Sequence, residues 1–272
     1  MKKKKTALAT KPGGIPEHVL DAVVAAPLRE EATETTPHQP LTVKPNYWRQ
    51  LDMFKGVDFN LLVHIFGVGA TGSYIAETVA KMGVQGIVVY DHDDVDDHNI
   101  PNQLYGTTDF KQLKVDALKT KLKELTGVEL FTVPKKIAGI KNLSGIVFLC
   151  VDSMASRKKI WESSIKQNPD VKLMIETRMG AEVGKIFIID PSNPEHIKQW
   201  EATLFEDKPE DAPVCTNTAI NSTIKTMVGY AAHSLVCYMQ KQPYPNELML
   251  CMRPPTLYTK SWVPQEKKSE QA

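Results

Sequence analysis

The chain has 272 residues, with 33 basic and 32 acidic side chains and a net charge of +1. This length is enough for one large domain or two small ones with a substantial core. The balanced charge excludes an overall basic field of the kind that attracts nucleic acid, so we expect no nucleic-acid partner.

The cysteines and the apolar segments narrow the class further. The four cysteines are Cys150, Cys215, Cys237 and Cys251, without a Cys-x-x-Cys pair, which argues against a structural zinc site and a disulfide framework. No apolar run approaches the roughly 18 residues of a membrane span, and the lysine-rich start lacks the apolar core of a secretory signal. We therefore expect a cytoplasmic protein without a membrane partner.

The two ends of the chain differ in composition from its middle. Residues 1–44 are rich in Lys, Thr, Glu, Pro and Ala and show little periodicity, which predicts a flexible N-terminal arm with a short helix near residues 16–26. Residues 258–272 are again polar, and we expect a loose C-terminal tail. Residues 45–257 form the expected functional domain.

The first predicted elements of this domain surround a glycine turn. An apolar strand at residues 61–66 leads into Gly67-Val68-Gly69-Ala70-Thr71-Gly72, a helix follows to about residue 82, and a second strand at 87–90 ends on Asp91. This order of strand, turn, helix, strand and acid is typical of a nucleotide site. A turn that only connects well-packed elements is the structural alternative.

Each feature of the turn has a physical role in a nucleotide site. Gly67 permits the tight turn, Gly69 lets a phosphate approach the backbone, and Gly72 lets the helix pack closely. The N-terminus of the helix supplies free N–H groups and a partial positive charge for that phosphate. Asp91 is placed to accept hydrogen bonds from ribose hydroxyls.

Strands and helices alternate in the rest of the domain. This alternation predicts an α/β fold with a Rossmann-like, mostly parallel sheet, helices on both faces, a long crossover loop and additional C-terminal strands. Ligands of such sheets bind beyond the carboxyl ends of the strands. The expected elements after Asp91 are a polar loop to residue 108, a helix at 109–125, strands at 128–133 and 146–151, a helix at 153–166, strands at 172–176 and 185–189, a long loop at 201–216, a helix at 219–239 and a strand at 247–252.

The loop after Asp91 favours a triphosphate over a nicotinamide ligand. It carries Asp93, Asn99 and Gln103, and Lys114 follows early in the next predicted helix. A nicotinamide site does not need this second polar cluster, whereas charge builds up at the α-phosphate and the departing pyrophosphate of a triphosphate. By position alone, Lys114 could also be a solvated surface lysine.

Several spaced motifs carry a resemblance to a known family. They are the glycine turn, Asp91-x-Asp93-x-Val95-x-x-x-Asn99 with Gln103, Lys114-Val115, and the strand end Leu149-Cys150-Val151-Asp152-Ser153 with Arg157 after it. They are similar to the motifs of the ThiF/MoeB/HesA superfamily, which are ubiquitin-activating-enzyme-like, ATP-dependent adenylyltransferases. The resemblance covers about residues 46–240 and implies adenylation of a carboxyl group with ATP and magnesium.

The resemblance also implies roles for individual residues. Lys114 would be the catalytic lysine, Asp152 would hold Mg²⁺ on the phosphates, and Asn99 and Gln103 would satisfy polar groups near the nucleotide. Arg49, in the segment Tyr-Trp-Arg-Gln, would reach into the ATP site of a partner subunit, which implies a homodimer or a heterodimer with a related chain. The structural alternative for Asp152 is a helix N-cap.

Cys215 precedes the long predicted helix, in the loop where this superfamily carries a cysteine that attacks the adenylate. A loop thiol near a helix N-terminus tends to have a lowered pKa and to stay accessible, as a nucleophile requires. We therefore expect Cys215 to form a thioester or related acyl intermediate. A plain loop cysteine is the alternative.

The sequence departs from the family pattern in two places. The arginine expected just before Gln103 is Asn102, which removes one phosphate-facing cation, and the paired Cys-x-x-Cys zinc ligands are absent. Asn102 is consistent with a specialised site or with a catalytically silent scaffold subunit. The acidic loop lacks the ligand spacing of a calcium site, whereas zinc at His92 and His98 stays open.

The expected substrate is a small ubiquitin-like or sulfur-carrier protein whose C-terminal carboxylate is adenylated. A peptide or a tRNA base stays open within the superfamily. The alternatives of a different class are the silent scaffold subunit and an NAD-dependent Rossmann dehydrogenase.

Overall fold

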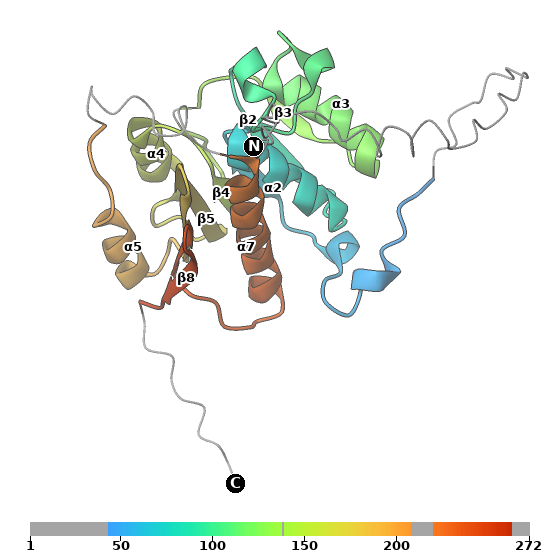
Figure 1. The fold of residues 1–272 in the computed structure, drawn as a ribbon. Helices are drawn as coiled ribbons and strands as arrows, with labels where there is room; N and C mark the ends of the chain where they lie inside the picture. Colours follow the sequence, from blue (N-terminus) through green and yellow to red (C-terminus); the bar gives the residue numbers. More distant parts are fainter. Residues whose placement is uncertain (1–42, 138, 208–219, 263–272) are drawn as a thin grey trace, which may run out of the picture. The chain divides into compact units, whose positions relative to one another are not determined.

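The computed structural model describes residues 43–137, 139–207 and 220–262, within a unit that begins at Lys44. Most of the expected N-terminal arm and most of the expected C-terminal tail lie outside these ranges, and so does Cys215. An eight-stranded sheet in the order β3-β2-β1-β4-β5-β6-β7-β8 forms the middle of this unit (Figure 1). The strands are β1 Val63–Phe66, β2 Ile87–Tyr90, β3 Phe131–Val133, β4 Gly145–Leu149, β5 Val171–Gly180, β6 Val183–Ile189, β7 Glu247–Met252 and β8 Pro255–Lys260.

The sheet has a parallel and an antiparallel half. Neighbouring strands from β3 through β5 pair in parallel, whereas β5, β6, β7 and β8 pair antiparallel. The α/β class and the additional C-terminal strands are thus confirmed. The strand order reverses between β1 and β4, which is the place where ligands of such sheets bind.

Helices cover both faces of the sheet, as expected (Figure 1). α2, α3 and α7 pack over one core, with α2 and α7 side by side, and α4 and α5 pack over the other. Short 3-10 turns occur at Trp48–Gln50, Gly56–Asp58, Asp97–Asn99 and Thr107–Asp109. The helices are α2 Ala70–Lys81, α3 Lys114–Thr126, α4 Met154–Ile160 with a π-helical continuation at Trp161–Ile165, α5 Pro194–Glu201 and α7 Asn221–Met239.

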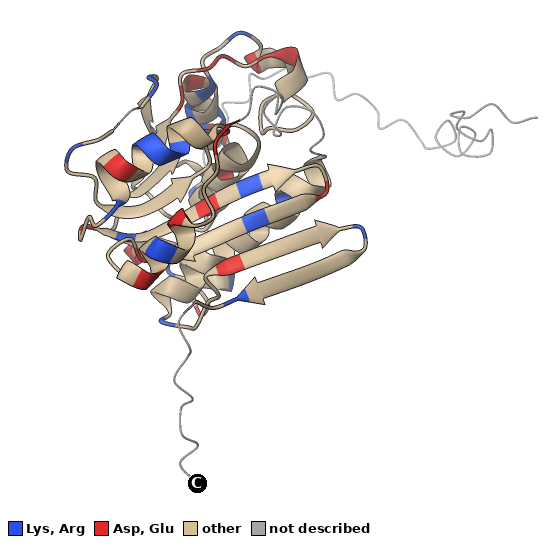
Figure 2. Ribbon diagram, turned by 90° about the vertical axis from the view of Figure 1, so that its left-hand side faces the viewer, with Lys and Arg blue, Asp and Glu red and all other residues tan. Residues whose placement is uncertain are grey.

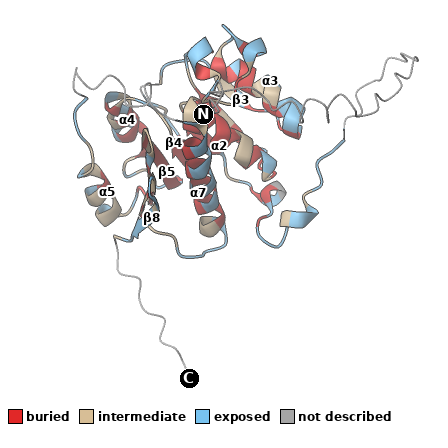
Figure 3. Cartoon of the chain, viewed as in Figure 1, coloured by how far each residue is buried: buried red, intermediate tan, exposed pale blue. Residues whose placement is uncertain are grey.

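Alternate residues of the central strands face the two cores. In β1, Val63 and Ile65 pack into one core and Phe66 into the other. Because both faces are covered, β1 is buried along its whole length and is apolar except for His64, whose ring is hydrogen-bonded to the Tyr90 hydroxyl. Figure 3 shows burial along the sheet-facing sides of the helices, and Figure 2 shows charged residues on helices, on loops and on some of the strands.

The helix expected at 109–125 begins later, at Lys114. Lys111 adopts a left-handed backbone conformation with φ of 64°. Its N–H donates to the Val95 carbonyl at 2.8 Å, and the Val95 N–H donates to the Gln112 carbonyl at 2.8 Å. This pairing with the acidic loop holds residues 111–113 out of the helix, so Lys114 becomes its first residue.

Two elements were not predicted. α5 begins after Asn193, whose side-chain oxygen accepts from the Glu195 N–H, and Pro194 is its first residue; an N-cap followed by proline is a start signal that the sequence does contain. β8 crosses the boundary expected at residue 257, so regular structure continues to Lys260. Among the helices of the described ranges, none combines the length and apolarity needed to cross a bilayer.

Candidate active site

A cavity of about 460 Å³ lies beyond the carboxyl ends of β1, β2 and β4. This is the place where we expected a ligand to bind, at the glycine turn and the carboxyl ends of the strands. The structure brings most of the predicted site residues to its wall. These are Gly67, Gly69, Asp91, Asp93, Asn99, Gln103, Lys114 and Asp152.

Two glycines shape the turn by close backbone approach. Gly67 has φ of +83°, and a Cβ there would lie 2.8 Å from the Cys150 carbonyl oxygen. A Cβ on Gly72 would lie 1.9 Å from the Gly67 carbonyl oxygen, so Gly72 packs the start of α2 against the turn instead of lining the cavity. A Cβ on Gly69 would meet only the Gln103 side chain, at 3.9 Å. Gly69 is therefore the open point of the turn, where a phosphate can approach.

Asp91 ties the end of β2 to the glycine turn. Its Oδ2 accepts from the Val68 N–H at 2.8 Å, and its Oδ1 accepts from the Asp93 N–H at 3.0 Å. The Val68 carbonyl accepts in turn from the Tyr105 hydroxyl at 2.8 Å. A carboxylate has about four acceptor positions, so Asp91 retains capacity for two ligand hydroxyls.

Lys114 lies inside the cavity and is not a solvated surface lysine. Its side chain is 8% exposed, and its Nζ lies 2.9 Å from Asp93 Oδ2. Its backbone N–H donates to the Asp93 carbonyl at 2.9 Å, so the same loop residue fixes both the start of α3 and the ammonium group. A buried cation at the wall of the cavity can neutralise phosphate charge.

Asn99 and Gln103 have different environments in the cavity wall. Asn99 Oδ1 accepts from the Asp96 N–H at 2.9 Å and so shapes the acidic loop. Gln103 Oε1 is buried, and no residue in the described part of the chain donates to it. It therefore remains available to a ligand donor. Asn102, at the position of the missing arginine, does not line the cavity.

Asp152 is an exposed residue in the turn between β4 and α4. The N-cap of α4 is Ser153, whose hydroxyl accepts from the Ser156 N–H at 3.2 Å, so the capping role considered for Asp152 belongs to its neighbour. Within residues 43–137, 139–207 and 220–262, no hydrogen bond or ion pair engages the Asp152 carboxylate. An available carboxylate oxygen is the kind of ligand that Mg²⁺ prefers.

Lys135 and Lys136, just after β3, also line the cavity, and the sequence analysis missed them. Both are exposed, and neither forms an ion pair within the described residues. They could have been found from their position, because a residue that follows a parallel strand lies at the same edge of the sheet as the glycine turn.

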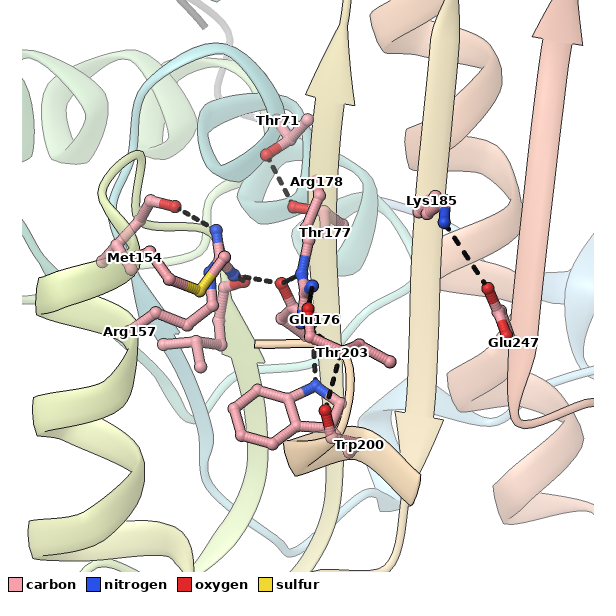
Figure 4. A network of polar contacts seen from close by, with 12 residues as sticks. Thr71, Met154, Arg157, Glu176, Thr177, Arg178, Lys185, Trp200, Thr203 and Glu247 are labelled. Carbon is pink, nitrogen blue, oxygen red and sulfur yellow. Dashed lines mark hydrogen bonds and ion pairs between the residues drawn. The ribbon is translucent and has the colours of Figure 1, made fainter. Parts of the chain in front are cut away.

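Cys150 is a further residue of the cavity wall that had no expected role in the site. Burial raises the pKa of its thiol to about 11, although hydrogen bonds with Thr177 and Thr71 oppose that shift. The hydroxyls of Thr71 and Thr177 lie 3.0 Å apart (Figure 4). Cys150 is therefore a protonated thiol near neutral pH, as expected for a core cysteine.

The remaining expected site residues differ in their relation to the cavity, which is lined by both histidines considered for zinc. Arg49 is exposed, does not line the cavity, and stacks its guanidinium 5.2 Å from the Trp48 ring. Cys215 lies outside the described residues. His98 pairs with Asp97 at 3.5 Å, while His92 lies beside Asp91 and Asp93, so the two histidines considered for zinc belong to different groups.

Comparison with known proteins decides the family. The ThiF family profile matches residues 59–268, which is most of the chain. The chain belongs to the ThiF family. This family match gives no support to the dehydrogenase alternative.

Individual relatives resemble this ThiF-family chain only in part. The tRNA threonylcarbamoyladenosine dehydratase of Bacillus subtilis is 39% identical over 67 residues, which are 24% of this chain and 26% of that protein. Escherichia coli MccB, solved with AMPCPP and MccA, superimposes with a TM-score of 0.54 at 11% identity over 76% of this chain and 65% of MccB. PaaA superimposes with a TM-score of 0.60 at 19% identity, over 75% of this chain and 73% of PaaA. At these identities the two structures establish the shared fold.

Proposed function

We propose that this ThiF-family protein uses ATP and Mg²⁺ to adenylate the C-terminal carboxylate of a small ubiquitin-like or sulfur-carrier protein in the cytoplasm. The observation that carries the proposal is Lys114, a buried ammonium in the wall of a cavity formed by the glycine turn and Asp91. Such an arrangement suits a polyphosphate, because a buried cation paired with a half-exposed carboxylate can be shared with incoming phosphate oxygens.

The reaction follows from the order of groups along the cavity. Asp91 would hold the ribose, and the backbone at Gly69 and the N-terminus of α2 would hold the phosphates. A carboxylate oxygen of the substrate attacks the α-phosphorus, the bond to the bridging oxygen breaks, and pyrophosphate leaves with the electron pair. Lys114 would stabilise the negative charge that accumulates during this step. Mg²⁺ held by Asp152 would supply further neutralisation of the phosphates.

Solved structures of MccB support ATP as the nucleotide ligand in our proposal. MccB is described as a microcin C7 biosynthetic enzyme, and its structures include one with ATP and others with MccA. The adenylating unit would comprise residues 45–257 together with the remainder of β8.

ATP–pyrophosphate exchange tests the substrate class. We expect exchange only when a partner with a free C-terminal carboxylate is added. The same partner with an amidated C-terminus is the matched control and should give none. Exchange that is equal with both forms would rule out the C-terminal carboxylate as the acceptor of the adenylyl group.

A tRNA nucleoside is a second candidate substrate, because the local match of 39% identity is to a tRNA-modifying protein. The net charge of +1 argues against it. The two candidates differ in what stimulates exchange. A tRNA substrate predicts exchange only when tRNA is added, whereas a carrier-protein substrate predicts that tRNA has no effect. ATP binding without exchange under any condition would instead identify the silent scaffold subunit that Asn102 suggests.

We propose that Cys215 takes the acyl group from the adenylate in a second step. The thiolate attacks the acyl carbon, and AMP leaves with the phosphate oxygen. Cys215→Ala should leave exchange nearly intact and abolish the reductant-sensitive adduct with the carrier. An adduct that still forms in Cys215→Ala would place the thiol elsewhere.

We also propose a homodimer in which Arg49 serves the site of the partner subunit, since Arg49 does not line the cavity of its own chain. Mixing Arg49→Ala chains with Lys114→Met chains should create one working site per heterodimer. A mixture that stays inactive despite subunit exchange would contradict action across subunits.

A further inference from the structure

The turn of residues 150–153 carries Asp152 between β4 and α4. Its first residue is tied by the Cys150 N–H, which donates to the Phe66 carbonyl at 2.8 Å, and its last residue by the Ser153 carbonyl, which accepts from the Arg157 N–H at 3.1 Å. The position of the Asp152 carboxylate therefore depends on what else holds the turn.

Arg157 holds this turn from the protein interior (Figure 4). The residue is 3% exposed. Its Nη2 donates to the Val151 carbonyl, directly before Asp152, and its Nη1 donates to the Leu149 carbonyl at 3.4 Å. The planar guanidinium can serve several acceptors at once, which the single ammonium of a lysine cannot reproduce with the same geometry.

Arg157 is not required as the counter-charge of Glu176. The fully buried Glu176 of β5 accepts from Arg157, from Arg178 Nε at 2.7 Å and from Trp200 Nε1 at 2.9 Å. Arg178 would therefore still neutralise Glu176 if Arg157 were replaced. The contribution that only Arg157 makes is its hydrogen bond to the Val151 carbonyl in the turn, together with the one to the Leu149 carbonyl at the end of β4.

We propose that Arg157 is a positioning residue for Asp152, which fixes the turn so that the carboxylate faces the cavity in the orientation that binds Mg²⁺ with ATP. The inference rests on the proposed function, because it requires a metal at Asp152. Groups that orient metal ligands without touching the metal commonly change metal affinity by about 10- to 100-fold.

Calorimetric titration of ATP, with Mg²⁺ and with a chelator, tests this assignment without measuring catalysis. In Arg157→Met and Arg157→Lys, we expect the gain in ATP affinity on adding Mg²⁺ to shrink by about tenfold or more, while metal-free ATP binding is unchanged. Arg178→Lys is the matched control, because Arg178 shares Glu176 but donates to Thr203 and not to the turn; its Mg²⁺ response should equal that of wild type. Thermal unfolding checks each variant, and Arg157→Lys keeps the buried charge if Arg157→Met does not fold.

A double-mutant cycle links the effect to the carboxylate. In an Asp152→Asn background, Arg157→Lys should cause no further loss of the Mg²⁺ response. A wild-type Mg²⁺ response in both Arg157 variants would overturn the assignment, and so would an equal loss in Arg178→Lys. Wild-type protein that does not bind ATP at all would refute the proposed function itself, a failure distinct from a lost Mg²⁺ response.

Discussion

The two sides of the cavity are held in place in different ways. On the side of the glycine turn, the anchors join consecutive segments of the chain: Asp91 accepts from the Val68 N–H, and Lys114 pairs with Asp93. The backbone of the acidic loop also sets the first residue of α3. This side is therefore determined by one continuous stretch of sequence.

On the other side, the turn carrying Asp152 is held by residues that come from later elements. Arg157 is paired with Glu176 of β5, and the Asp207 carboxylate accepts from the Met154 N–H at 3.0 Å. Arg157 belongs to the motif that follows Asp152, but Glu176 and Asp207 cannot be identified from the local pattern. The nucleotide side of the cavity, which comprises the glycine turn, Asp91 and Lys114, is therefore built by local sequence. The metal side, which comprises the turn carrying Asp152, depends on the tertiary fold.

Removing the charge of Glu176 should have the largest effect on folding. Glu176→Gln would leave the buried Arg157 and the partly buried Arg178 without their carboxylate partner, and breaking a buried ion pair typically costs about 3–5 kcal/mol of unfolding free energy. Glu247→Gln is the control, because its pair with Lys185 is 3.8 Å long and partly exposed (Figure 4), and should cost less than about 1 kcal/mol. Urea unfolding of both variants measures the difference; equal stability would contradict a tertiary origin of the metal side.

Gly72→Ala tests how the nucleotide side is packed, because the substitution adds a Cβ to the glycine turn. A Cβ that would lie 1.9 Å from the Gly67 carbonyl oxygen must displace backbone, and overpacking of this kind costs about 3 kcal/mol. Gly69→Ala is the matched control, because its Cβ would meet only the Gln103 side chain, at 3.9 Å. We expect urea unfolding to show normal stability for Gly69→Ala and reduced stability for Gly72→Ala. The reverse order would mean that the turn is not packed as described.

Asp91→Ala should weaken ATP binding more than it weakens folding. A hydrogen bond to a charged group contributes about 1.5–3 kcal/mol, and the variant loses the ribose acceptor together with the support of the Val68 N–H. Calorimetry with ATP and with NAD measures the loss. Unchanged ATP affinity, or tighter binding of NAD than of ATP by the wild type, would contradict the assignment of this side to ATP.

The smallest effect concerns the thiol of Cys150, which lies where the two sides meet. Because its pKa is raised to about 11, the reactive thiolate is scarce at pH 8 and increases about tenfold per pH unit up to pH 10. Alkylation of Cys150, followed by peptide mass spectrometry, should therefore be slow at pH 8 and accelerate with pH. Rapid labelling at pH 8 would show that the thiol is not buried.

The nucleotide side could be predicted from the sequence because its residues follow one another at characteristic spacings along one continuous stretch of the chain. The glycine turn, Asp91, Asp93 and Lys114 all reach the cavity. The start of α3 could not be predicted, because the loop pairing that unwinds residues 111–113 competes with their helical pattern.

The metal side could be predicted from the sequence only in part. Asp152 was found from its motif, but its support by Glu176 and Asp207 was not, since those partners are placed by the sheet order and by the segment after α5. The same is true of Lys135 and Lys136, which reach the cavity only because β3 pairs beside β2.

The most direct test of the adenylation site is pyrophosphate exchange by Lys114→Met beside Lys119→Met. Lys119 lies on the same helix but is more exposed and pairs with Glu129 at 3.5 Å, so its loss should leave the exchange rate at the wild-type level. Loss of Lys114 should reduce the rate by about 10²–10³-fold, because the variant no longer neutralises charge in the transition state. A Lys114→Met protein that is folded and exchanges at the wild-type rate would contradict the account.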